Sequence, residues 1–144
     1  MSIIRASLVA AFLVACSSSS SSGPAPQGLP GTWSATKPEF VNADDANTRV
    51  DVVAKGTTVT LVLDTSTFAL TQKDPVAAPV VTNGSWTANS DLMTFTPTGM
   101  SFSWVFQMAL NGNDLSLTGA SVEFDFNDDG IYEQAKLNLA LVRK

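Results

Sequence analysis

The alternation of apolar and polar residues predicts that most of this chain forms short β-strands. Every second residue from Thr58 to Leu63 is apolar, which places Val59, Leu61 and Leu63 on one face. The same period of two runs through residues 101–110, where most of the apolar positions are aromatic. Successive side chains of a strand point to opposite faces, so each segment can bury one face and expose the other. No segment of residues 29–144 has a convincing helical period, so we expect an all-β domain there.

Turn-forming residues divide these apolar runs. Asn111-Gly112 is the strongest short hairpin signal in the chain, and Asn89-Ser90-Asp91 separates two further alternating segments. The pattern predicts about eight short strands in an antiparallel up-and-down barrel, with a β-sandwich as the alternative. Residues 38–56 interrupt the pattern as a long polar connection between the first two strands. We expect a short helix or an extra edge strand within it.

The N-terminus has the layout of a secretory signal peptide. Arg5 precedes an apolar run from Ala6 to Ala15, about half the ~20 residues that a membrane-spanning helix needs. The four residues Leu13-Val14-Ala15-Cys16 resemble the lipobox of bacterial lipoproteins. This resemblance implies that residues 1–15 are removed and that Cys16 is acylated, so the membrane is a partner through an acyl anchor. Two or more acyl chains give stable anchoring.

Residues 16–28 have the composition of a flexible tether. They consist mainly of serine, proline and glycine, which cannot bury enough apolar surface to fold. Ser17 follows the cysteine directly, whereas an aspartate there is the usual inner-membrane retention signal of Gram-negative lipoproteins. We therefore expect a lipid-anchored protein of the cell envelope, at the periplasmic face or surface of the outer membrane. Residues 29–144 are long enough for one domain with one core.

Composition excludes several kinds of function. The chain has thirteen acidic residues, eight basic residues, one cysteine and no histidine. Removal of residues 1–15 takes away Arg5, leaving seven basic residues and a net charge of −6, which argues against a nucleic-acid partner. A Ser-His-Asp triad, a Cys-His pair and a histidine- or thiolate-ligated zinc site cannot be assembled. We expect a non-enzyme without a cofactor, apart from the calcium alternative described below.

A second resemblance concerns the two ends of the predicted barrel. Gly31-Thr32-Trp33, at the start of the first strand, resembles the Gly-x-Trp motif of lipocalins. In that family the tryptophan closes one end of the barrel, and an arginine at the end of the last strand packs across it. Arg143 occupies that position, on the same face as Leu137 when counted by twos. The Thr-Asp-Tyr motif and flanking helix of lipocalins are missing, so the chain resembles the short lipocalin-like domains of bacterial lipoproteins.

Aromatic residues are the candidates for a ligand-binding wall. A barrel of this kind binds a small apolar molecule if its interior is open, with residues 38–56 as the lid. The proposed wall residues are Trp86, Phe102, Trp104 and Phe106. The alternative is that these side chains form a packed core, since small barrels are often filled by side chains. In that case the protein is a structural or interaction module that contacts another envelope protein.

One string resembles the opening of a calcium-binding loop. It begins at Asp125, carries oxygen ligands at positions 1, 3 and 5, a glycine at position 6 and an acid at position 9. The candidate ligands are Asp125, Asn127, Asp129 and Glu133. Position 12, where such loops have a glutamate, is Lys136. The other interpretation is a hairpin with residues 127–130 as its turn, and a weak calcium site is the alternative.

Overall fold

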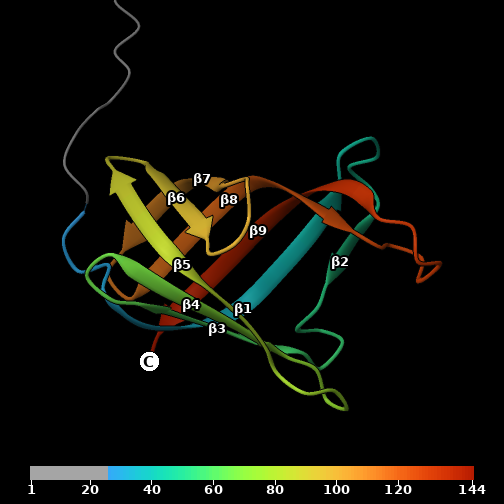
Figure 1. The fold of residues 1–144 in the computed structure, drawn as a ribbon, viewed down its shortest axis with the longest axis horizontal. Helices are drawn as coiled ribbons and strands as arrows, with labels where there is room; N and C mark the ends of the chain where they lie inside the picture. The colour runs from blue at the N-terminus through green and yellow to red at the C-terminus, as the bar shows by residue number, and fades with distance from the viewer. Residues whose placement is uncertain (1–25) are drawn as a thin grey trace, which may run out of the picture.

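The computed structural model describes residues 26–144, which form nine antiparallel strands and no helix (Figure 1). The strands are β1 (Gly31–Asn42), β2 (Arg49–Asp51), β3 (Thr58–Leu63), β4 (Thr67–Lys73), β5 (Val80–Asn89), β6 (Leu92–Pro97), β7 (Trp104–Asn111), β8 (Asp114–Phe124) and β9 (Glu133–Arg143). This part of the chain therefore contains no helix long and apolar enough to cross a membrane. The predicted signal peptide, lipobox and Cys16, and most of the predicted tether, lie outside the described residues.

Pairing between the first and last strands closes the sheet into a barrel. The strand order is β2-β1-β3-β4-β5-β6-β7-β8-β9, and β1 also pairs with β9 from Trp33↔Arg143 to Asn42↔Ala135. Eight strands form the barrel, and β2 lies along β1 as a short ninth strand. The expected all-β, eight-stranded up-and-down barrel of lipocalin-like type is confirmed. The β-sandwich alternative is excluded, because a sandwich does not close through its first and last strands.

Two bulges change which residues face the interior. In β8 the register shifts between Leu117 and Ala120, where Gly119 has a φ of 88° and donates its N–H to Asn138 Oδ1 at 2.9 Å. In β1 the shift falls between Ala35 and Lys37. An extra residue inverts the alternation beyond it. In β8 the inward residues therefore have odd numbers before the bulge (Leu115, Leu117) and even numbers after it (Ala120, Val122). The strand continues through the bulge without a break.

The segment from Pro38 to Gly56 differs from its predicted form. It was expected to be a loop with a short helix or edge strand, but β1 continues through it to Asn42. Pro38 is tolerated because the neighbour on one side of β1 changes there. Pairing with β3 stops at Ser34, and pairing with β2 starts at Glu39. A proline without an N–H donor can occupy such a gap. The expected extra edge strand is β2.

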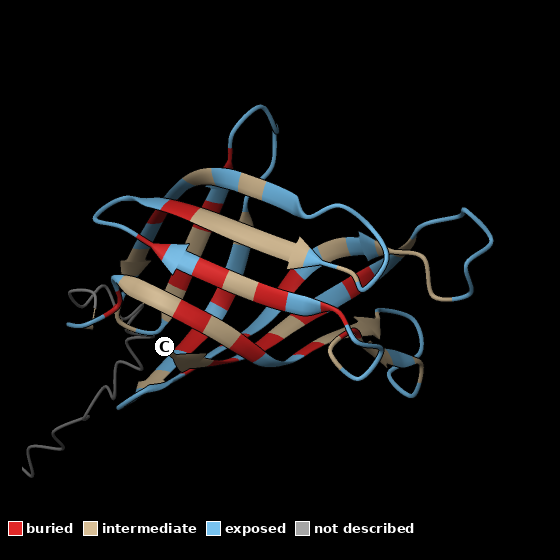
Figure 2. Ribbon diagram, turned by 90° about the horizontal axis from the view of Figure 1, so that it is seen from below, coloured by how far each residue is buried: buried red, intermediate tan, exposed pale blue. Residues whose placement is uncertain are grey.

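The connections between the strands lie at two opposite ends of the barrel, and those at one end are shorter than those at the other. Short turns at residues 64–66, 90–91 and 112–113 lie at one end, which we call the closed end. The connections 43–57, 74–79, 98–103 and 125–132 lie at the other, which we call the open end. Buried residues alternate with exposed ones along the strands, as Figure 2 shows. Residues 26–144 hold all eight barrel strands and one contiguous hydrophobic core.

Candidate functional site: a cavity at the open end of the barrel

The closed end is sealed by Trp33 and Arg143. Trp33 is fully buried, and its indole N–H donates to the carbonyl oxygen of Leu29 at 3.0 Å. The guanidinium of Arg143 lies 4.3 Å from the centroid of the Trp33 ring. It also donates hydrogen bonds to the carbonyl oxygens of Gly28 and Pro30, the latter at 3.0 Å. These bonds hold residues 28–30, which precede β1, across the closed end of the barrel.

Aromatic side chains fill the interior next to this seal. Phe95 contacts Phe68 and Phe106 edge-on, with ring centroids 4.8 and 5.7 Å apart. Phe106 is only 1% exposed. Edge-to-face pairs of this kind add about 0.5–1.5 kcal/mol to the stabilisation from burial. This half of the barrel is a packed core.

The other half encloses a cavity of about 660 Å³. This volume is within the range of ~300–1,000 Å³ typical of small-molecule sites. The apolar residues lining it are Pro38, Phe40, Val52, Val59, Leu70, Val80, Phe102, Trp104, Val122, Tyr132, Leu137 and Leu139. The polar ones are Gln72, Thr82, Ser103, Ser121, Glu123 and Gln134. The cavity is thus mainly apolar, and Gln72 and Thr82 are polar residues at inward-facing strand positions.

Two of the four proposed wall residues line this cavity. Trp104, at the start of β7, is half-buried and lies between the cavity and Phe68, whose ring centroid is 6.3 Å away. Phe102 is 53% exposed and comes from the β6–β7 loop. Its expected place in a strand is wrong, because Phe95 is the last β6 residue that pairs with β7. Pro97, two residues later, has no N–H to continue the ladder.

The other two proposed wall residues do not line the cavity. Trp86 is buried at the closed end, where its indole N–H donates to the carbonyl oxygen of Asp64 at 2.9 Å. Phe106 belongs to the packed core described above. Both face the barrel interior, as their alternation predicts. The distance of each residue from either end depends on strand register, which sequence periodicity does not reveal.

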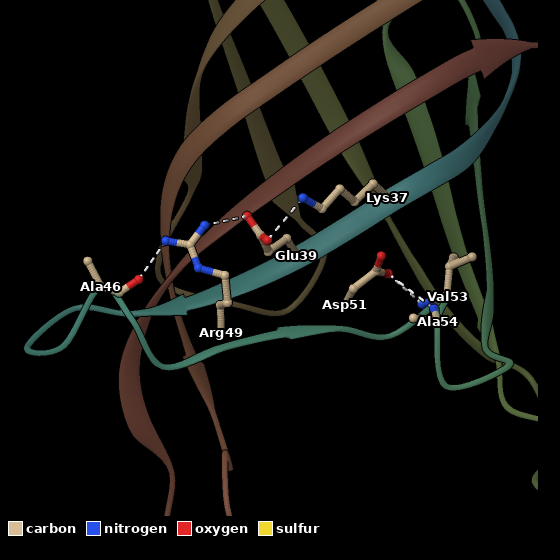
Figure 3. A network of polar contacts seen from close by, with 7 residues as sticks. All are labelled: Lys37, Glu39, Ala46, Arg49, Asp51, Val53 and Ala54. Carbon is tan, nitrogen blue, oxygen red and sulfur yellow. Dashed lines mark hydrogen bonds and ion pairs between the residues drawn. The ribbon is translucent and has the colours of Figure 1, made fainter.

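The segment expected to be a lid contributes three residues to the cavity wall, Pro38 and Phe40 from β1 and Val52 from the connection after β2. Val52, directly after β2, is 7% exposed and lines the cavity, and its N–H donates to the carbonyl oxygen of Pro38 at 3.2 Å. Asp51 Oδ1 accepts the N–H groups of Val53 and Ala54, which fixes the turn that follows (Figure 3). These contacts hold Val52 at the cavity wall.

Two ion pairs lie on the outer surface, one within β1 and one between β2 and β1. Glu39 lies 3.2 Å from Lys37 Nζ and 3.7 Å from Arg49 Nη1, and Arg49 also donates to the carbonyl oxygen of Ala46 (Figure 3). Exposed pairs of this kind contribute ~0–1 kcal/mol each. Their main effect is to hold the charged groups of Lys37 and Arg49 next to Glu39 on the outer surface of the barrel.

The predicted calcium string forms the β8–β9 loop, whose oxygens accept hydrogen bonds within the loop. Asp125 accepts the backbone N–H groups of Asn127, Asp129 and Gly130 at 2.8–3.3 Å. Partial desolvation raises the pKa of Asp125, but the hydrogen bonds from Gly130 and the neighbouring N–H groups outweigh it, so the pKa is lowered overall. Glu133 Oε2 accepts the N–H of Phe126.

The three carboxylates among the candidate ligands, Asp125, Asp129 and Glu133, do not form a metal-binding cluster. Among residues 26–144, no three carboxylate, histidine or cysteine groups lie close enough together to hold a metal ion. Asn127 Nδ2 instead donates to Asp129 Oδ2 at 3.0 Å. The loop is thus a hairpin connection that satisfies its own polar groups.

Several cavity residues were not singled out from the sequence. Phe40, Val52, Val122 and Tyr132 belong to segments that the sequence assigns to a loop, a separate strand or a turn. Phe40 was missed because the β1 bulge hides its alternation with Trp33. Tyr132 was missed because it lies in an irregular loop. Once the β1 bulge is recognised, counting by twos from Pro38 finds Phe40.

No protein-family model, curated protein or solved structure matches this chain. The geometry of the cavity and the sequence signals at the N-terminus are therefore the features of this chain that point to a function.

Proposed function

We propose that this protein is a lipid-anchored, non-catalytic envelope protein that binds a small apolar molecule in the open half of its barrel. The observation that carries the proposal is the apolar cavity of about 660 Å³ above a packed and sealed core. An eight-stranded barrel is just wide enough for side chains to fill, so a barrel that acts only as a rigid module can bury apolar side chains throughout its interior. The alternative interaction module was expected to have a filled interior, so the cavity favours ligand binding.

The point at which the chain enters the barrel supports this proposal. Gly28 and Pro30 accept hydrogen bonds from Arg143 at the closed end, whereas the cavity is lined by residues from the loops at the opposite end. An acyl anchor at Cys16 would therefore hold the barrel by its closed end. The mouth then remains accessible to ligand from the side away from the tether.

The test compares what co-purifies with the natural chain and with a cavity-filled variant. Thr82 is half-buried and lines the cavity, so Thr82→Trp places an indole inside it. The matched control is Thr87→Trp, on the same strand with its side chain exposed. Both full chains are purified from the host, extracted with organic solvent and analysed by mass spectrometry.

We expect one or a few small apolar species in extracts of the natural chain and of Thr87→Trp, and their loss from Thr82→Trp. Identical extracts from all three proteins would contradict ligand binding. They would favour the interaction module, and the search would turn to protein partners. Circular dichroism establishes that each variant keeps the β fold.

A further inference from the structure

We propose that the ligand of this cavity carries an uncharged polar head that donates and accepts hydrogen bonds, and that Gln72 and Thr82 bind this head. This inference rests on the proposed ligand-binding function and adds the chemical class of the ligand, a neutral amphiphile such as a long-chain alcohol or amide. It follows from which polar side chains of the cavity wall face inward and which of them already have a hydrogen-bond partner.

The polar residues that β8 and β9 contribute to the edge of the cavity belong to the outer surface. Val122 faces inward beyond the β8 bulge, so Ser121 and Glu123, its neighbours along the strand, face outward. Glu123 Oε1 accepts a hydrogen bond from Gln134 Nε2 at 3.1 Å, and Ser121 Oγ accepts one from Lys136 Nζ at 2.6 Å. These groups are partnered outside the barrel, and neither the carboxylate nor the ammonium group faces the cavity.

Gln72 and Thr82 differ from these residues because their polar groups are available to a ligand. Both lie at inward strand positions of the cavity wall and are half-buried. Within residues 26–144 neither side chain has a hydrogen-bond partner, whereas Ser103 Oγ, in the β6–β7 loop, is bonded to Thr96 Oγ1 at 3.0 Å. In the same residues no buried side-chain nitrogen or oxygen lacks a partner, so the polar atoms of Gln72 and Thr82 are open to the cavity.

The two side chains are close enough to bind one head group together. β4 pairs with β5 so that Leu70 lies opposite Thr82 and Gln72 lies opposite Val80. Gln72 and Thr82 are therefore diagonal neighbours on the inner face of adjacent strands. Diagonal neighbours lie ~7–8 Å apart, within reach of long side chains. A head group placed between them can bond to both.

The chemistry of these two groups selects an uncharged head. A glutamine amide and a threonine hydroxyl both donate and accept hydrogen bonds, so a hydroxyl or carboxamide of the ligand can satisfy them. Among the described residues that line the cavity and face inward, none is charged. A ligand carboxylate or ammonium would therefore lose hydration without gaining an opposite charge, which is costly. A hydrocarbon without a polar head would displace water from Gln72 and Thr82 and leave them unpaired.

The test uses three probes with the same eight-carbon chain: octanol, octanoate and octylammonium. Their binding to the full chain, freed of co-purified ligand on an apolar resin, is measured by isothermal titration calorimetry at pH 7.5, where both ionic probes are charged. About 1 M salt reduces the Debye length to ~3 Å, so exposed charges on the loops have little influence. We expect octanol to bind at least about tenfold more tightly than either ionic probe.

Three variants locate the polar end of the site. Gln72→Leu and Thr82→Val replace each polar group by an apolar one of similar size, and each should weaken octanol binding about three- to tenfold, as the loss of one neutral hydrogen bond does. The matched control is Thr71→Val, next to Gln72 on β4 but on its outward face, and it should leave the affinity unchanged. The melting temperature of each variant establishes that the fold is kept.

The outcomes separate this inference from the proposal on which it rests. If octanoate or octylammonium binds as tightly as octanol, the cavity binds ligands but the preference for an uncharged head is wrong. If Gln72→Leu and Thr82→Val bind octanol no more weakly than Thr71→Val does, the assignment of the head to these two residues is wrong. If none of the probes binds the folded protein, the ligand-binding proposal fails and this inference fails with it.

Discussion

The guanidinium of Arg143 lies over the indole of Trp33, 4.3 Å from the ring centroid, and links the last barrel strand to the first. Its two terminal nitrogens donate to the carbonyl oxygens of Gly28 and Pro30. One side chain thus joins the end of β9, the start of β1 and the segment that precedes it. Gly31 has a φ of 143° and passes close beneath this guanidinium, where a Cβ would clash with Arg143 Nη1. These contacts all lie at the closed end of the barrel, opposite the cavity.

Replacing Arg143 should therefore weaken the fold without affecting the cavity. Arg143→Ala loses the contact with Trp33 and two hydrogen bonds, and we expect the free energy of unfolding to fall by about 1–3 kcal/mol. Arg143→Lys keeps the charge but loses the planar fork, so its stability should be intermediate. Urea denaturation measures both, and ligand affinity should stay at its natural value. An unchanged midpoint for Arg143→Ala would show that the seal contributes no stability.

A second prediction concerns the glycine at which β5 approaches its neighbours most closely. A Cβ on Gly84 would lie 2.7 Å from Phe68 Cε1 and 2.8 Å from Pro97 Cα, and would also clash with the carbonyl oxygen of Thr96. Two of these atoms are backbone and cannot rotate away. Gly84→Ala should lower the free energy of unfolding by about 1–3 kcal/mol, as overpacking does.

The matched control for Gly84→Ala is Ser85→Ala, one residue later on the exposed face of β5. It should change the melting temperature little. If Gly84→Ala changes the melting temperature as little as Ser85→Ala does, the atoms around Gly84 can move apart without cost. The close approach would then not limit the packing of β5.

The sequence predicts the strands and turns well because both signals are local. The hairpin at Asn111-Gly112 connects β7 to β8 directly, with Gly112 at a φ of 60°. Alternation fails where the chain inserts an extra residue. Leu117 and Val122 both face inward, but they are separated by an odd number of positions because of the bulge at Gly119. The sequence therefore divides β8 into two apolar segments.

The position of a residue along the barrel axis is not a local property. Trp86 and Trp104 both face inward on nearby strands, but one is buried at the closed end and the other lines the cavity. Their heights depend on how far each strand is staggered against the next, which is set by pairing around the whole barrel. Periodicity can thus predict which residues face inward, while the division into packed core and cavity wall requires the structure.

The third prediction concerns acid stability and calcium at the β8–β9 loop. The hydrogen bonds of Asp125 outweigh desolvation and lower its pKa in the folded state. A lowered folded pKa means that the ionised carboxylate stabilises the fold above the unfolded pKa. This stabilisation is lost as the pH falls through the lower, folded value. Asp125→Asn should therefore flatten the decline in melting temperature on the acid side, while Asp128→Asn serves as a control within the same loop.

The same loop should respond equally in calcium and in chelator. Because backbone N–H groups already satisfy Asp125, we expect its substitution to lower the melting temperature to the same extent in both conditions. Differential scanning fluorimetry with and without a chelator measures this. A melting temperature that falls on chelation in the natural chain but not in Asp125→Asn would establish the calcium site instead.

The last prediction uses two aromatic residues of β7 that face inward two positions apart. Phe106 is buried against Phe95, so Phe106→Ala should cost about 3–5 kcal/mol of stability, and Phe106→Leu less, with ligand affinity almost unchanged. Trp104 is half-buried at the cavity, so Trp104→Ala should cost less stability but weaken ligand binding at least tenfold. Denaturation and calorimetry on the same proteins separate the two effects. If both substitutions reduced affinity in proportion to stability, the boundary between core and cavity would not lie between these two side chains, and the open half would be a loosely packed extension of the core.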